Sequence, residues 1–119
     1  MYTIRVEAGF AAAHYLTEYH GKCERLHGHN YVVRAYARGE ELDKAGMLLD
    51  FGELKGRLRE VCERLDHGSL NDLPAFKDSP SAERIARYIF EEVRSLDPSA
   101  PLHAVEVFET PTSMARYEP

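Results

Sequence analysis

Residues 23–29, Cys-Glu-Arg-Leu-His-Gly-His, decide the fold, together with His14 one short loop upstream. Side chains alternate along a strand, so His27 and His29 project from the same side of an extended chain. His14 ends one apolar segment and His27 starts the next, so an antiparallel hairpin places His14 across from this pair. Three neutral imidazoles with an open fourth position are typical of a catalytic zinc site. The sequence therefore predicts zinc bound by His14, His27 and His29.

Cys23 lies four residues before His27 and has two interpretations. As a fourth ligand it would close the site and make the zinc structural, in a domain without catalytic activity. As a thiolate, favoured by the neighbouring Lys22 and Arg25, it would be a base or nucleophile facing a metal-bound substrate. The residues alone leave both interpretations open.

Hydrophobic periodicity outside this stretch predicts strands at both ends of the chain and a pair of helices between them. Asp50 and Ser79-Pro80 are helix start signals, and Asp97-Pro98 is a stop signal. The order is ββααββ, which indicates an α+β fold with an antiparallel sheet and the helices on one face. We expect one domain over residues 1–119. The predicted elements are strands over 3–14 and 27–38, helices over 50–66 and 79–96, and strands over 105–109 and 112–117.

Composition excludes several classes of protein. The chain has 119 residues, of which 44% are hydrophobic and 29% charged, as in an ordinary globular protein. The net charge of -5 and the absence of a Lys/Arg block argue against nucleic acid as a partner. No apolar run approaches a membrane span, and the first residues do not resemble a signal peptide. We therefore expect a cytoplasmic protein with no membrane partner.

Two further acidic residues, Asp66 and Glu109, are candidates for proton transfer and for ligand binding. His67 follows Asp66 at the predicted end of the first helix, where a His commonly complements the helix dipole. A carboxylate beside an imidazole can instead orient it for proton transfer. Glu109 ends a strand and is either a solvent-facing edge charge or a carboxylate that accepts paired N–H bonds from a guanidine-like ligand edge.

Taken together, these motifs resemble the 6-pyruvoyl-tetrahydropterin synthase family, including its bacterial branch of 6-carboxy-tetrahydropterin synthases in queuosine biosynthesis. The resemblance spans nearly the whole chain. It implies the tunnelling fold, in which sheets close into a barrel across subunits, and a homo-oligomer, a hexamer, with active sites at subunit interfaces. The motifs are Ala12-Ala13-His14, residues 23–29, Leu49-Asp50-Phe51, Leu65-Asp66-His67, Leu70-Asn71-Asp72 and Phe108-Glu109-Thr110.

The resemblance also implies roles for single residues. The three histidines would hold Zn²⁺, Cys23 would be the catalytic thiolate, and Asp66 with His67 would be a proton-relay pair from a neighbouring subunit. Glu109, helped by Thr110, would anchor the pterin ring. The implied substrate is 7,8-dihydroneopterin triphosphate, and the implied reaction is a carbon–carbon lyase reaction. It yields 6-carboxy-5,6,7,8-tetrahydropterin, acetaldehyde and triphosphate.

Glu24 departs from the simplest family pattern because it directly follows Cys23. Relatives with Cys alone resemble carboxy- or pyruvoyl-forming enzymes. Those with Glu and no Cys resemble folate-pathway enzymes that release 6-hydroxymethyl-7,8-dihydropterin. Glu24 is therefore either a second catalytic base in a dual-function enzyme or an ordinary solvated charge. A 6-pyruvoyl-tetrahydropterin synthase also remains an alternative.

Overall fold

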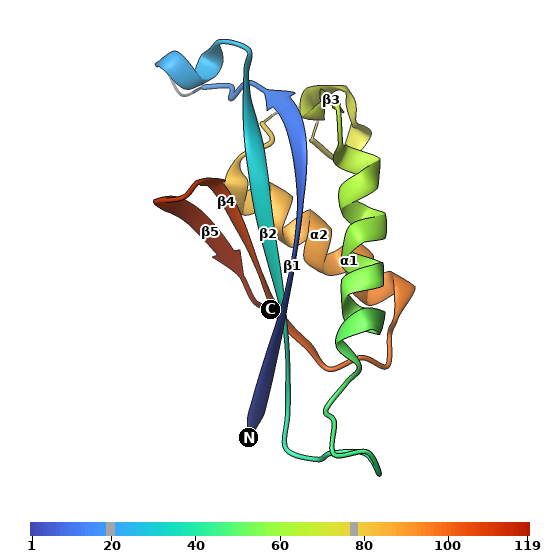
Figure 1. Cartoon of the computed structure of the whole chain (residues 1–119). Coiled ribbons are helices and arrows are strands. Elements are labelled where there is room, and N and C mark those ends of the chain that lie inside the picture. Colours follow the sequence, from blue (N-terminus) through green and yellow to red (C-terminus); the bar gives the residue numbers. More distant parts are fainter. Residues whose placement is uncertain (19–20, 77–78) are drawn as a thin grey trace.

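A five-stranded sheet with two α-helices on one face makes up the described chain (Figure 1). The computed structural model describes residues 1–18, 21–76 and 79–119, and of Cys23 the backbone alone. The predicted α+β class is confirmed. The main elements are β1 (Tyr2–His14), β2 (His27–Gly39), α1 (Phe51–Leu65), β3 (Gly68–Ser69), α2 (Ala82–Leu96), β4 (Leu102–Thr110) and β5 (Ser113–Tyr117), and the short 3-10 turns are η1 (Lys22–Glu24), η2 (Leu70–Asp72) and η3 (Pro74–Phe76).

The long β1–β2 hairpin is the backbone of the sheet. Its register pairs His14 with His27, as the sequence predicts, and also pairs Ala12 with His29 and Phe10 with Tyr31. Directly opposed residues of an antiparallel pair project to the same face. Further from His14 along the hairpin, the same face carries small and branched side chains, which are buried against the helices. They include Val6, Val33, Ala35 and Ala37.

Each α-helix begins at a capping side chain. Asp50 Oδ1 accepts a hydrogen bond from the Gly52 N–H at 2.7 Å, which confirms the predicted start of α1. Ser81 Oγ accepts from the Arg84 N–H at 3.3 Å, so α2 begins two residues later than Ser79-Pro80 indicates. The apolar stripes of both helices pack on β1 and β4 and close the core.

The segment predicted as a loop after α1 contains a short strand. β3 pairs parallel to β1, with Ala12 opposite Gly68 and Ala13 opposite Ser69. The sheet is therefore mixed, in the order β3-β1-β2-β4-β5. Two residues are too few to show a period in the sequence, so no pattern could predict this strand. The two turns η2 and η3 follow it directly.

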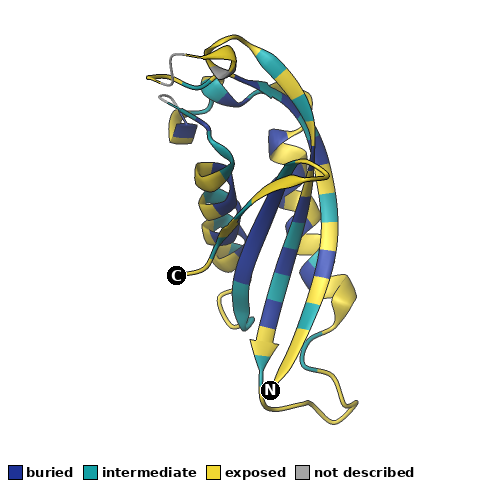
Figure 2. Ribbon diagram, turned by 90° about the vertical axis from the view of Figure 1, so that its left-hand side faces the viewer, coloured by how far each residue is buried: buried dark blue, intermediate teal, exposed yellow. Residues whose placement is uncertain are grey.

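The outer face of the sheet has no helix over it (Figure 2). Residues along β1 and β2 alternate between buried and exposed, as expected for a sheet covered on one side. β5 forms one edge, and β3 covers only Ala12 and Ala13 at the other, so most of β1 is an open edge within the described chain. None of the described helices is long and apolar enough to cross a membrane.

Candidate active site

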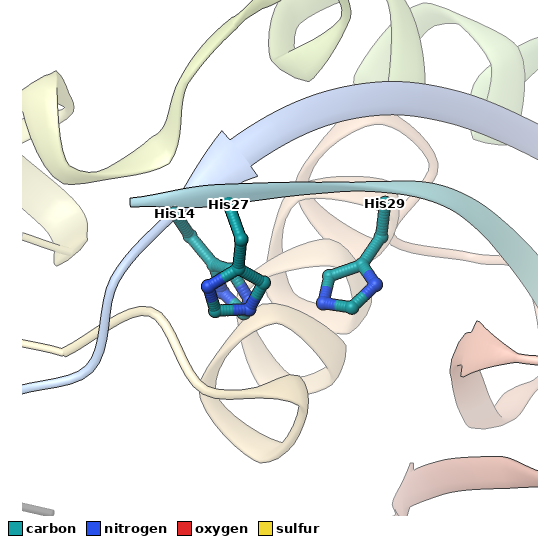
Figure 3. Close-up of side chains that lie close together, drawn as sticks. All are labelled: His14, His27 and His29. Atoms are coloured by element: carbon teal, nitrogen blue, oxygen red, sulfur yellow. The ribbon is translucent and has the colours of Figure 1, made fainter. Parts of the chain in front are cut away.

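Three histidines converge at the end of the β1–β2 hairpin (Figure 3). His14 projects from the last residue of β1, and His27 and His29 project from the start of β2 on the same face. One nitrogen of each imidazole lies within 4.8 Å of the others, so the group can hold a metal ion. Nε2 of His14 and Nε2 of His27 are 3.0 Å apart. Ladder pairing therefore brings together the ligands that the sequence predicts.

The outer nitrogens of two of these rings are bonded to backbone carbonyls. His14 Nδ1 lies 2.8 Å from the Pro80 oxygen, and His27 Nδ1 lies 2.7 Å from the Arg25 oxygen. A carbonyl only accepts, so each Nδ1 carries the proton and each Nε2 presents a lone pair. Metal-bound histidines commonly have their tautomer set in this way.

This arrangement is costly without a cation, and the residues therefore fit a metal. Two lone pairs face each other across 3.0 Å, and Nε2 of His29 is buried with no hydrogen-bond partner among the described residues. A buried polar atom left unpaired costs free energy. A single cation bound to all three Nε2 atoms would satisfy them together, and imidazole is a ligand that zinc accepts readily.

Burial favours the neutral, metal-binding form of His14. Burial lowers the pKa of His14, although the Pro80 carbonyl and Glu109 act in the opposite direction. A neutral imidazole is the ligand form. Glu109 lies beside the cluster, with its two oxygens 3.9 Å from Nε2 of His14 and of His29.

Glu109 and Thr110 line a cavity of about 620 Å³ together with His29. They stand at the end of β4, where the register with β5 shifts between Phe108 and Thr110. This irregularity is consistent with Glu109 reaching both the cavity and the histidines. The Arg34 guanidinium, 4.6 Å from the centroid of the Phe108 ring, forms part of the same wall.

Tyr31 is a residue of the site that the sequence does not distinguish from a packing residue. Its ring lies 5.8 Å from that of His14 and 5.4 Å from that of His29, centroid to centroid. Its hydroxyl is buried without a partner among the described residues, and burial raises its pKa. Tyr31 therefore stays neutral beside the cluster. Its only sequence signal is the spacing of two residues from His29.

Asp66 and His67 form a pair at the edge of β1, next to Ala11. Nδ1 of His67 is 2.7 Å from Asp66 Oδ2, while Asp66 Oδ1 accepts from the Ala11 N–H at 2.8 Å. These bonds, that of Ala11 foremost, lower the pKa of Asp66. His67 has a positive φ of 58° and an 82% exposed side chain.

The cavity beside His67 opens over the outer face of the hairpin. Its lining includes Ala11, Ala13 and Asn30, which alternate with the three histidines and so project to the opposite face. His29 of the cluster lines this cavity as well.

Cys23 and Glu24 lie in η1, between β1 and β2. The side chain of Cys23 falls outside what the structure describes, so its predicted role is untested. Glu24 is exposed and lines a small cavity with Lys22 and Arg25, separate from the cavity at Glu109. The backbone here is a 3-10 turn and not a strand.

Comparison with known proteins extends over almost the whole chain. The family model described as 6-pyruvoyl tetrahydropterin synthase matches residues 3–119. A relative from Synechocystis named 6-carboxy-5,6,7,8-tetrahydropterin synthase is 42% identical, over 98% of this chain and 93% of its own length. A relative of the same name from Haemophilus influenzae is 30% identical over 99% of both chains.

A solved structure shows the same fold. The 6-pyruvoyl tetrahydropterin synthase of Caenorhabditis elegans superposes with a TM-score of 0.89 at 34% identity, covering 99% of this chain and 95% of its own. The prediction of an enzyme of the tetrahydropterin synthase type is confirmed. The relatives include one named as a carboxy-forming synthase and one named as a pyruvoyl-forming synthase. The chain belongs to the 6-pyruvoyl tetrahydropterin synthase family.

Proposed function

We propose that this protein is a zinc-dependent carbon–carbon lyase that converts 7,8-dihydroneopterin triphosphate to 6-carboxy-5,6,7,8-tetrahydropterin, acetaldehyde and triphosphate. The observation that carries the proposal is the histidine cluster, whose Nε2 atoms converge while backbone carbonyls hold two of the Nδ1 atoms. The names of the Synechocystis and H. influenzae relatives support the carboxy-forming reaction. We place the enzyme in the cytoplasm, in queuosine biosynthesis.

The cluster suits this chemistry. Zinc bound at His14, His27 and His29 would supply Lewis acidity and lower the pKa of the hydroxyls on the substrate side chain. Cys23 and His67 would then move protons on either side of that side chain. Asp66 would hold the His67 ring, since its Oδ2 lies 2.7 Å from Nδ1.

Glu109 would orient the pterin. Its carboxylate lines the cavity of about 620 Å³ and stands beside the metal ligands. A carboxylate can accept two parallel N–H bonds from an amino-pyrimidine edge, which gives both affinity and orientation. Thr110, on the same wall, would assist.

We propose further that the working site needs a second copy of the chain, in a hexamer. His67 is highly exposed, and its ring is bound to Asp66 rather than to the histidine cluster of its own chain. The open edges of β1 and β5 provide backbone groups for pairing between subunits, and closing a sheet into a barrel removes such edges. One chain would then contribute the histidines and its neighbour the Asp66–His67 pair.

The reaction is tested by mass spectrometry of the products after incubation with dihydroneopterin triphosphate and zinc. The carboxy product with acetaldehyde supports the proposal, and a pyruvoyl product without acetaldehyde contradicts it. Release of 6-hydroxymethyl-7,8-dihydropterin alongside would indicate a dual function.

Two single variants assign that second product. We expect Cys23→Ala to lose the carboxy product and to keep any hydroxymethyl release, because Glu24 would remain as a base. We expect the reverse for Glu24→Ala. An unchanged set of products in Glu24→Ala would make Glu24 a solvated charge.

A structural zinc closed by Cys23 is the competing non-enzymatic interpretation, and alkylation separates the two. A Cys23 that ligates zinc resists iodoacetamide until the metal is removed, whereas a catalytic thiolate reacts at neutral pH. Cys62 is the internal control, because it is buried and burial raises its pKa to about 12.

A further inference from the structure

The end of β1 is held by the side chain of a residue far away in the sequence. The ladder with β2 stops at His14, so the peptide groups of Tyr15 have no strand partner there. Asn71 provides one. Its Oδ1 accepts from the Tyr15 N–H at 2.9 Å, and its Nδ2 donates to the Tyr15 carbonyl at 3.0 Å.

This pair lies two residues beyond the last pair of the β1–β3 ladder, in the same register. Ala13 pairs with Ser69 in that parallel ladder, so the same register continued by two residues brings Tyr15 opposite Asn71. The backbone of residue 71 has already turned into η2, where the Leu73 N–H donates to the Leu70 carbonyl. The carboxamide of Asn71 has the same donor and acceptor as a peptide group. It replaces the missing strand residue.

We propose that Asn71 is a positioning residue for the metal site, which it serves by fixing the backbone that carries His14. This inference rests on the proposed metal binding. His29 lies within paired β2, whereas His14 and His27 are the terminal pair of the ladder, and the chain leaves β1 directly after His14. Beyond it the Tyr15–Asn71 pair fixes the chain direction, and a weaker contact follows from the Thr17 N–H to Ser79 Oγ at 3.4 Å.

The geometry at His14 leaves little tolerance. Its Nε2 lies 3.0 Å from Nε2 of His27 while its Nδ1 reaches the Pro80 carbonyl at 2.8 Å. A shift of the Tyr15 peptide would move both ends of the ring at once. Loss of an outer partner of a metal ligand commonly costs about 10- to 100-fold in metal affinity. Asn71 contacts the backbone of Tyr15 and not the His14 ring itself. We therefore expect the lower end of that range, about a tenfold loss of zinc affinity for Asn71→Ala.

The test measures zinc affinity directly, by competition with a chromogenic chelator. The matched control is Asp43→Ala. Asp43 Oδ1 also accepts two backbone N–H bonds, from Ala45 at 2.8 Å and Met47 at 3.0 Å. It lies in the connector between β2 and α1, at the opposite end of the hairpin (Figure 1). We expect Asp43→Ala to lower Tm but to leave the zinc dissociation constant unchanged.

A second variant keeps the test decisive if Asn71→Ala does not fold. Asn71→Asp retains the acceptor for the Tyr15 N–H and loses the donor, so we expect a smaller loss of zinc affinity. The cobalt(II) absorption spectrum should report a less regular site in both variants. Wild-type affinity in both Asn71 variants, or an equal loss in Asp43→Ala, would overturn the inference. If the wild-type protein binds no zinc, the proposed function fails instead.

Discussion

The histidine cluster and the Asp66–His67 pair are built in opposite ways. The cluster lies on the covered face of the sheet, and backbone carbonyls hold two of its rings. The pair lies at the edge of β1, and its imidazole is 82% exposed. Asp66 is nonetheless anchored by the Ala11 N–H. Metal ligands must converge within a few ångströms, so one chain supplies them. A proton-transfer group needs only a fixed orientation, and a second chain can present it.

The largest effect is expected from removing a metal ligand. His27→Ala should lose stoichiometric zinc and nearly all activity, because metal assistance supplies several kcal/mol, or at least about a thousandfold in rate. Metal analysis after dialysis, with steady-state kinetics, checks both. His103→Ala is the control, since His103 pairs with Glu118 instead. Full zinc occupancy in His27→Ala would remove His27 from the ligand set.

Removing the exposed imidazole of His67 should lower the activity somewhat less. We expect His67→Ala to keep its zinc and to lose roughly 10²- to 10⁴-fold in kcat, the usual contribution of a general acid or base. The same variant tests whether the two regions belong to different chains. Inactive His67→Ala and inactive His27→Ala protein, dissociated together and reassembled, should regain part of the activity. No recovery would mean that each chain uses its own His67.

A smaller change is expected at Glu109, beside the cluster. Glu109→Gln keeps the size of the side chain and replaces one acceptor with a donor, which mismatches a guanidine-like ligand edge. Hydrogen bonds to charged groups contribute about 1.5–3 kcal/mol, so KM should rise about 10- to 100-fold. The Tm of Glu109→Gln should stay within a degree or two of the Tm of Glu91→Gln, a control substitution on α2. An unchanged KM would place the substrate elsewhere.

The smallest effect concerns stability at the anchor of the pair. The folded pKa of Asp66 is depressed, so its stabilising contribution is complete above the unfolded value of 3.8 and is lost as the pH falls through the folded value. Asp66→Ala should therefore lower Tm by a few degrees at pH 7 and by progressively less as the pH falls below 3.8. Thermal unfolding across that pH range measures the difference. A difference in Tm that stays constant with pH would contradict the pKa shift.

The cluster could be predicted because its geometry follows from strand parity. His27 and His29 differ by two residues, and His14 lies at the matching end of the preceding strand, so ladder pairing alone brings them together. The two helices could be predicted in the same way, from the period of their apolar residues and from their capping residues. These signals are local, and each is repeated along several residues.

The rest of the site depends on features without a period. The approach of Glu109 to the histidines accompanies a register shift in β4, and the placement of His67 accompanies a positive φ at a non-glycine residue. β3 is two residues long, so neither it nor the support that Asn71 gives to Tyr15 could be foreseen.

The uncovered edge of β1 has a consequence for the enzyme at low concentration. On the proposal that neighbouring chains complete each site, dissociation and inactivation are the same event, and the Tm depends on protein concentration. Specific activity should then fall on dilution and recover on reconcentration. Saturating substrate, which would contact both chains, should shift the loss to lower concentration. A cell would thus set the active fraction partly through the abundance of this one polypeptide.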